Sequence, residues 1–132
     1  MSQENVESSR QVWERFLAGD TPGVLARLDP EVEVYDPPDL PGAGVYHGHA
    51  GWTEQIAKFR EAFDQFDYKV LEHIDCGESV VTVVEASATG SGSGISGTVT
   101  YAEVETWRNG KVVSIRYFTG KQAALEAAGL RE

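Results

Sequence analysis

Few residues of this sequence have the type and spacing that enzyme chemistry requires. His47 and His49 stand two positions apart, but a zinc site needs three or four ligands and no suitably spaced third ligand follows. His73 falls on a predicted strand and is expected at the surface. Cys76 lacks a neighbouring base or lysine that would activate it as a nucleophile. Residues 90–94, a Gly/Ser run, lack the Gly-Lys-Ser/Thr ending of a phosphate loop. We therefore expect no metal and no organic cofactor.

A second group of residues could line a pocket for a small apolar molecule. It comprises the aromatic residues Trp13, Phe16, Trp52, Phe59 and Tyr117. Each of them singly is more typical of an ordinary core, because large aromatic side chains dominate any small core. Tyr35 could offer its hydroxyl as a hydrogen-bond donor, or it could be an exposed strand tyrosine. The five aromatic residues and Tyr35 are therefore candidate ligand contacts.

Hydrophobic periodicity predicts three helices in the first half of the chain. Apolar residues recur at three- and four-residue steps from about Asn5 to Ala18 and from His49 to Asp64. Between these segments, Thr21 is a candidate N-cap and Pro22 the first residue of a short helix. A further short helix is predicted from about Lys121 to Ala128.

The remaining segments favour strands. Alternation and β-branched residues predict strands over Glu31–Asp36, Phe66–Asp75, Val80–Thr89, Ile95–Arg108 and Val112–Thr119. The segment from Pro37 to Gly48 is rich in proline and glycine and predicts an irregular loop. Helices followed by hairpin-connected strands indicate an α+β domain, with a curved, mainly antiparallel sheet packed on three N-terminal helices. Such a cone-shaped barrel encloses a cavity whose mouth is a natural pocket. The length of 132 residues predicts a single domain, 1–132.

A hairpin near the end of the chain predicts which residues share a face of the sheet. Asn109-Gly110 is a strong type I′ turn signal, and counting outward pairs Arg108 with Lys111 and Val104 with Ile115. The face predicted to meet the helices and the cavity carries Ala102, Val104, Thr106, Val113, Ile115 and Tyr117. The face predicted to be half-exposed, or to pair two sheets in a dimer, carries Tyr101, Glu103, Glu105, Trp107, Ser114, Arg116 and Phe118. Val104 is thereby a further candidate ligand contact.

Composition excludes several classes of partner. The formal charge is −10, from 21 acidic and 11 basic residues. This charge argues against binding to nucleic acid or to an anionic membrane surface, both of which need basic patches. The segment Met1–Arg10 is polar and does not predict a signal peptide, and no stretch reaches the about 18 apolar residues of a spanning helix. A single cysteine fits a reducing compartment, so we expect a cytoplasmic protein.

The order of these elements and four short motifs resembles the nuclear transport factor 2-like superfamily, most closely its SnoaL-like and ketosteroid isomerase-like branch. The motifs are Gly19-Asp20, Tyr35-Asp36-Pro37-Pro38, Gly48 and Gly110-Lys111-Val112-Val113. Their order and spacing, rather than any one of them, carry the resemblance, which covers Val6 to Leu130. The resemblance implies a six-element cone fold, a hydrophobic cavity and a homodimer. It does not imply one activity, because the fold hosts isomerases, cyclases, epoxide hydrolases and non-catalytic binders.

Asp36 is the residue that the resemblance identifies as a catalytic candidate. In the ketosteroid isomerase pattern, the base is the aspartate of a strand-ending Asp-Pro after a Gly-Asp pair, and Gly19-Asp20 and Asp36-Pro37 match that spacing without a gap. A carboxylate at a cavity mouth can take a proton from the carbon next to a ketone and return it elsewhere. The alternative is structural: Asp36 could cap the turn before the two prolines.

The sequence departs from the isomerase pattern at both oxyanion donors. The position of the helix tyrosine is Val12, which donates nothing, and that of the second acid falls on Glu103 or Val104. The predicted faces favour Val104. Losing one such donor typically costs on the order of hundredfold in rate, so a classical ketosteroid isomerase is not expected. The Asp-Arg-Asp set of a limonene-type epoxide hydrolase is also incomplete, because no second cavity aspartate accompanies Asp36 and Arg116.

Two functions from different classes follow. The first is a homodimeric SnoaL-like protein that binds a small, largely apolar molecule and uses Asp36 as base in proton abstraction, isomerisation or cyclisation. The second is a non-catalytic ligand-binding or dimerisation module of the same fold. An enzyme should bury Asp36, raise its pKa and place a donor across the cavity, whereas a binder should leave Asp36 solvated or bonded to backbone.

Overall fold

The computed structural model describes residues 2–36, 44–90 and 96–129, apart from the side chains of residues 2, 59, 62–66 and 90. Within these ranges the helices are α1 (Ser2–Leu17), α2 (Thr21–Leu25), α3 (Gly48–Ala62) and α4 (Lys121–Ala127). The strands are β1 (Leu28–Asp36), β2 (Gly44–His47), β3 (Phe63–Cys76), β4 (Ser79–Gly90), β5 (Ser96–Arg108) and β6 (Lys111–Phe118). The predicted α+β class and its order of elements are confirmed. The short strand β2 lies within the segment predicted as irregular loop.

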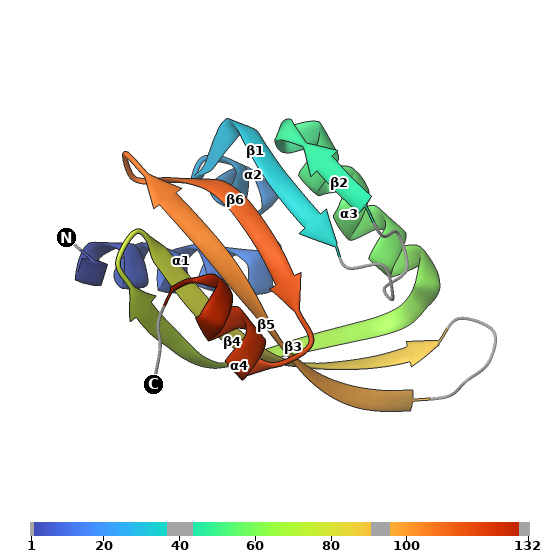
Figure 1. Cartoon of the computed structure of the whole chain (residues 1–132). Helices are drawn as coiled ribbons and strands as arrows, with labels where there is room; N and C mark the ends of the chain where they lie inside the picture. The colour runs from blue at the N-terminus through green and yellow to red at the C-terminus, as the bar shows by residue number, and fades with distance from the viewer. Residues whose placement is uncertain (1, 37–43, 91–95, 130–132) are drawn as a thin grey trace.

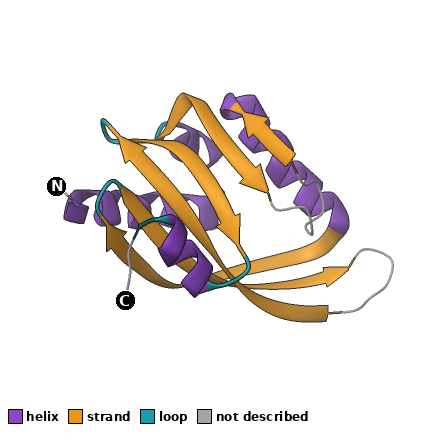
Figure 2. Ribbon diagram, in the orientation of Figure 1, coloured by secondary structure: helices purple, strands orange, loops and turns teal. Residues whose placement is uncertain are grey.

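The strands form one curved sheet in the order β2-β1-β6-β5-β4-β3 (Figure 1). Every neighbouring pair is antiparallel except β1 and β6, which run parallel. The helices α1, α2 and α3 lie behind the sheet in Figure 2, whereas α4 crosses its front. We call the first side the helix face and the second the outer face. Within the described residues, no helix is long and apolar enough to cross a membrane.

The helix starts follow from local chemistry. Asp20, not Thr21, is the N-cap of α2, because its carboxylate accepts the backbone N–H of Gly23 at 3.0 Å. This corrects the sequence prediction by one residue and leaves Pro22 within the first turn. The hydrogen bond holds the pKa of Asp20 below its usual value, with help from Arg15 at 2.9 Å. This cap fixes the corner between α1 and β1, and β1 carries the candidate base.

A one-residue bulge in β6 changes the faces that the hairpin count predicted. Arg108 pairs with Lys111 and Trp107 with Val112 as expected, but Thr106 then pairs with Ser114, so Val113 is the extra residue. Beyond the bulge every partner is displaced by one position, and a displacement of one moves side chains to the opposite face. The predicted faces were therefore wrong for β5 and for Val113, which lines the groove on the outer face, and right for Ile115 and Tyr117.

The corrected register assigns the strongly polar residues of β5 to the helix face. Residues of β5 and β6 that share the helix face are Tyr101, Glu103, Glu105, Trp107, Val112, Ile115 and Tyr117. Val104 lies on the outer face, in a core cluster with Ala124 and Leu125 of α4. Phe118 packs beside the same cluster. The predicted dimer contact was based on one face shared by three aromatic residues. In the structure, Tyr101 and Trp107 lie on the helix face and Phe118 on the outer face.

Gly48 is the point where β2 turns into α3, and its conformation is specific to glycine. Its φ is +73°, and a Cβ there would lie 3.0 Å from the carbonyl oxygen of Pro30. We expect Gly48→Ala to lower the free energy of unfolding by about 1–3 kcal/mol, because it adds both left-handed strain and a backbone clash. Urea denaturation would measure the loss. Gly97→Ala is the matched control: a Cβ there meets nothing within 4 Å, so a similar loss would contradict the explanation.

Candidate active site

Asp36 is buried on the helix face at the end of β1. Val34, two positions earlier, packs in the core under the helices, and strand alternation puts Asp36 on the same side. Asp36 is 7% exposed, and both of its carboxylate oxygens lie 3.2 Å from Nε2 of Gln55 on α3. Burial raises the pKa of Asp36 to about 6, although the Gln55 hydrogen bond opposes the rise. Asp36 therefore changes protonation state close to neutral pH.

Two tyrosines and an acid from β5 and β6 share this side of the sheet. Glu103 pairs in register with Tyr117, and the ring centroids of Tyr101 and Tyr117 are 5.9 Å apart. Burial is the main cause that raises the pKa of both phenols well above their usual value, and the acidic groups of Glu103 and Asp36 on the same face raise it further. Both phenols are therefore neutral hydrogen-bond donors at neutral pH. Their electrostatic coupling to Asp36 puts all four groups in one interior neighbourhood.

Glu105 is the centre of a buried hydrogen-bond network that joins β5 to α1. Its carboxylate accepts Ser9 Oγ–H at 2.6 Å, Trp13 Nε1–H at 3.0 Å and Thr82 Oγ1–H at 3.1 Å. His73 Nδ1 lies 3.1 Å from the Thr82 hydroxyl and 3.2 Å from that of Ser9. Burial lowers the pKa of His73 below its usual value, which keeps its ring neutral. His73, expected at the surface, is thus half-buried inside this network.

Glu103 keeps its proton because of its neighbours. Burial, then the charge of Glu105 and a hydrogen bond with it, and then the charge of Asp36, raise the pKa of Glu103 well above its usual value. A hydrogen bond between two carboxyl groups requires a proton, and Glu105 is already bound by three donors as a carboxylate. Glu103 is therefore the neutral acid of the pair. Glu103, and not Val104 as the predicted faces favour, is therefore the residue on the helix face that matches the second oxyanion acid.

The predicted aromatic ligand contacts divide between several places. Phe16 lies at the centre of an edge-to-face cluster, with ring centroids 5.5 Å from Trp13, 6.2 Å from Trp52 and 5.2 Å from Tyr68. Burial raises the pKa of Tyr68 to about 12. Phe16 and Trp52 also line a groove of about 420 Å³ between the end of α1, α2 and α3. The side chain of Phe59 lies outside the described residues. Tyr117 is beside Glu103.

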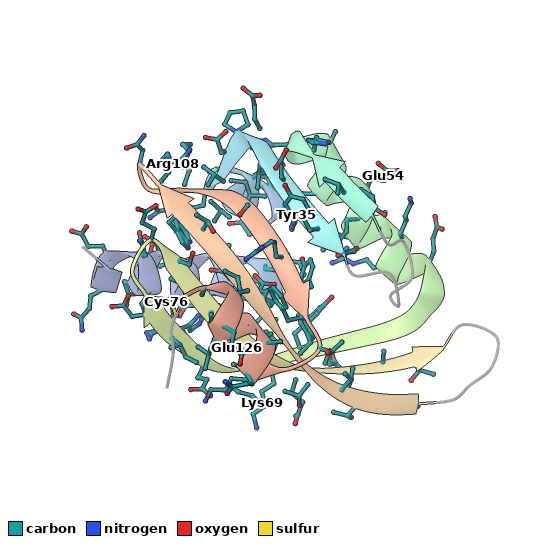
Figure 3. The ribbon with its side chains drawn as sticks, in the orientation of Figure 1. Tyr35, Glu54, Lys69, Cys76, Arg108 and Glu126 are labelled. Carbon is teal, nitrogen blue, oxygen red and sulfur yellow. The ribbon has the colours of Figure 1, made fainter. Side chains whose placement is uncertain are left out.

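Tyr35 lies on the outer face, away from the buried neighbourhood of Asp36. It pairs with Arg116 across the parallel strands, and its hydroxyl donates to Glu33 (Tyr35 is labelled in Figure 3). The Glu33 hydrogen bond raises its pKa above the usual value. An open groove of about 1190 Å³ covers this part of the outer face, and Asp36 and Tyr117 belong to its lining. Tyr35 thus contacts that groove rather than the helix face.

The histidines and the cysteine stand apart from Asp36. His47 pairs with Glu33 at 3.5 Å on the exposed edge, and His49 Nε2 is 2.8 Å from the carbonyl oxygen of Leu28. Burial raises the pKa of Cys76 above its usual value, which disfavours the thiolate. Within residues 2–36, 44–90 and 96–129, no three His, Cys, Asp or Glu side chains gather as metal ligands.

Sequence reasoning had missed the partners that define this site. Gln55 is 1% exposed and follows Trp52 by three positions, on the apolar stripe of α3. Ser9 lies in the same way between Val6 and Trp13 on the apolar stripe of α1. A polar residue inside an apolar stripe is the signal that could have found both, because burial of such a group requires a polar partner.

Comparison with known proteins gives one family and many structures. A family model described as SnoaL-like domain matches residues 9–115. The search of curated proteins found no match. Among solved structures, an NTF2-like protein of unknown function from Burkholderia pseudomallei is 26% identical, with 93% of this chain and 95% of that chain covered and a TM-score of 0.80.

Two further structures extend the comparison. TerC, co-crystallised with polyporic acid, is 25% identical over 96% of this chain and 98% of that chain, with a TM-score of 0.79. A putative SnoaL-like polyketide cyclase from Jannaschia sp. is 18% identical over 99% of this chain and 95% of that chain, with a TM-score of 0.76. At 18% identity the likeness concerns the fold alone.

Proposed function

The chain belongs to the SnoaL-like domain family, and from that premise we propose that it catalyses cofactor-free proton transfer on a small, largely apolar carbonyl compound. Asp36 is the general base in this proposal. The observation that carries it is the burial of Asp36 with a pKa raised to about 6. A base whose pKa lies near the working pH is both deprotonated and strong enough to accept a proton from carbon.

The proton transfer needs a donor for the oxygen that becomes negative. When Asp36 takes a proton from the carbon beside a carbonyl, the electron pair moves onto the carbonyl oxygen and makes an enolate. The neutral phenols of Tyr101 and Tyr117 are donors of the right kind on the same face. Glu103, held protonated, adds no negative charge against the enolate. Where a double bond adjoins the acidic carbon, the enolate is a dienolate, and return of the proton from Asp36 to its far carbon completes an isomerisation and regenerates the base.

The alternative of a non-catalytic binder is less well supported. A binding module has no need for a buried, near-neutral carboxyl, whose ionised form is costly to hold in a fold. Within the described residues, the carboxylate of Asp36 is hydrogen-bonded to the Gln55 side chain rather than to backbone, as expected of a reactive group and not of a turn cap. TerC with polyporic acid supports a small-molecule ligand for either function.

Deuterium uptake beside the carbonyl tests the catalytic role of Asp36. We expect the wild-type protein to catalyse exchange in at least one member of a panel of cyclic ketones, followed by NMR in deuterated buffer at pH 7.5. Asp36→Asn should lower the catalysed rate by at least about a hundredfold, because an amide cannot accept the proton. Asp67→Asn, on the exposed side of β3, is the control and should leave the rate unchanged. Equal rates for wild type and Asp36→Asn would exclude Asp36 as base.

A further inference from the structure

One buried polar atom beside Asp36 has no hydrogen-bond partner among the described residues. This atom is Oε1 of Gln55, on a side chain that is 1% exposed. Leaving a buried acceptor unpaired costs about 1–3 kcal/mol. An unpaired acceptor in a native fold therefore indicates a functional role, such as binding a ligand that donates to it. The other such atom, Nε1 of Trp107, lies in the apolar core against Val80 and Val112. Only the Gln55 atom adjoins an ionisable group with an altered pKa.

The orientation of the Gln55 amide is fixed by Asp36. A carboxylate only accepts hydrogen bonds, so the NH₂ end of the amide must face it, and Nε2 lies 3.2 Å from both oxygens. The carbonyl end of the same planar amide is then held beside the carboxylate but receives no donor from it. A base and an unpaired acceptor therefore stand side by side on the helix face.

The polar groups near Asp36 differ in what they need from a ligand. Asp36 and Gln55 Oε1 both require hydrogen from a ligand, whereas the phenols of Tyr101 and Tyr117 offer it. A simple ketone presents an acidic carbon and a carbonyl oxygen but leaves Oε1 unpaired. A ketone with a hydroxyl on or next to the acidic carbon offers an acidic hydrogen to Asp36, an acceptor oxygen to the phenols and a donor hydroxyl to Oε1 of Gln55.

We propose that the ligand of this site is a hydroxy ketone, whose hydroxyl group donates to Oε1 of Gln55 while its acidic carbon faces Asp36. This inference rests on the proposed function and specifies its substrate class. Gln55 is a specificity-determining residue in this account: it orients the base through Nε2 and selects the hydroxyl through Oε1. A site built to receive a hydrogen bond discriminates strongly against the analogue that lacks it.

A matched pair of probes tests the hydroxyl preference. We would measure dissociation constants of 2-hydroxy-1-tetralone and 2-methoxy-1-tetralone, which differ by one methyl group on the relevant oxygen. The wild-type protein should bind the hydroxy ketone about tenfold more tightly, and in Gln55→Met the ratio of the two constants should fall to about one. The ratio is informative even if Gln55→Met weakens binding generally, since that loss affects both ketones. Glu54→Gln, on the exposed side of α3 (Figure 3), should keep the wild-type ratio.

The outcomes separate this inference from the function on which it rests. A ratio near one in the wild type, or an unchanged ratio in Gln55→Met, overturns the hydroxyl subsite while leaving small-ligand binding intact. Absence of binding of either ketone by the wild type overturns both. Because the readout is binding, it is independent of the exchange test on Asp36: a hydroxyl preference without exchange would retain the subsite and reject the catalytic role.

Discussion

Asp36→Asn is expected to be more stable than the wild-type protein at pH 8, by about 2 kcal/mol in the free energy of unfolding. The pKa of Asp36 is about 6 in the folded chain, against an ordinary value of 3.8. As the pH rises from about 4 to 6, the unfolded chain releases this proton before the folded one, so wild-type stability falls through that window. Each unit of pKa difference corresponds to about 1.4 kcal/mol, an upper bound here because the side chain relaxes. Asparagine does not ionise and can also donate to Oε1 of Gln55.

Urea denaturation at pH 4 and pH 8 would measure this effect. The stability difference should be largest at pH 8 and shrink toward pH 4, where the wild-type carboxyl is protonated in both states. Asp67→Asn, on an exposed strand position, should show no such pH dependence. A difference of the same size at both pH values would mean that Asp36 titrates normally, and the argument for a near-neutral base would fail. An inactive variant that is more stable than the wild type is the signature of a group retained for function.

Glu105→Leu is expected to destabilise the protein by about 3–5 kcal/mol. The substitution removes the shared acceptor of Ser9, Trp13 and Thr82. Trp13 Nε1–H then loses its partner, and among the described residues the two hydroxyls keep only each other and His73. Hydrogen bonds to a charged group contribute about 1.5–3 kcal/mol each, and losses within one network add incompletely. Glu105→Gln keeps one acceptor oxygen and should lose less, about 1–2 kcal/mol.

The decisive observation is whether Glu105→Leu is less stable than Glu105→Gln. Leucine should be more destabilising than glutamine only if the network needs an acceptor at position 105. Glu85→Leu, a half-buried glutamate on the neighbouring strand β4, is the comparison for the cost of replacing a strand glutamate as such. Tryptophan fluorescence during urea denaturation reports all of these variants. A leucine variant at position 105 as stable as the wild type would show that the network contributes nothing.

The elements of the fold were predictable because their signals are local. The apolar stripes of α1 and α3, the Asn109-Gly110 turn and the β-branched strands each depend on residues a few positions apart. The start of α2 was misplaced by one residue because Asp20 and Thr21 are both good N-caps, and only the hydrogen bond to Gly23 distinguishes them. Pairing of β1 parallel to β6 joins distant segments and has no local signal at all.

The candidate site was predictable only in part. Asp36 was found through its motif, but its pKa depends on α3 covering the end of β1, which the motif does not specify. Val104 was chosen over Glu103 because the hairpin count assumed an unbroken ladder. Val113 is an ordinary β-branched strand residue, so nothing in its identity announces a bulge. The pairing of β5 with β6 puts Glu103 and Glu105 on the helix face, and this pairing is a tertiary feature.

The bulge at Val113 also restricts how this sequence can change in evolution. It inverts the relation between odd and even positions once, between the hairpin tip and the part of β6 that pairs with Glu103. Pairing Val113 with Thr106 would close the bulge, return Tyr117 to the outer face and bring Arg116 opposite Glu103. Deletion of Val113 would also close the bulge but would leave Glu103 opposite Tyr117. The lineage can therefore shorten this strand by one residue at the bulge, but an insertion there needs a compensating change to keep Tyr117 on the helix face.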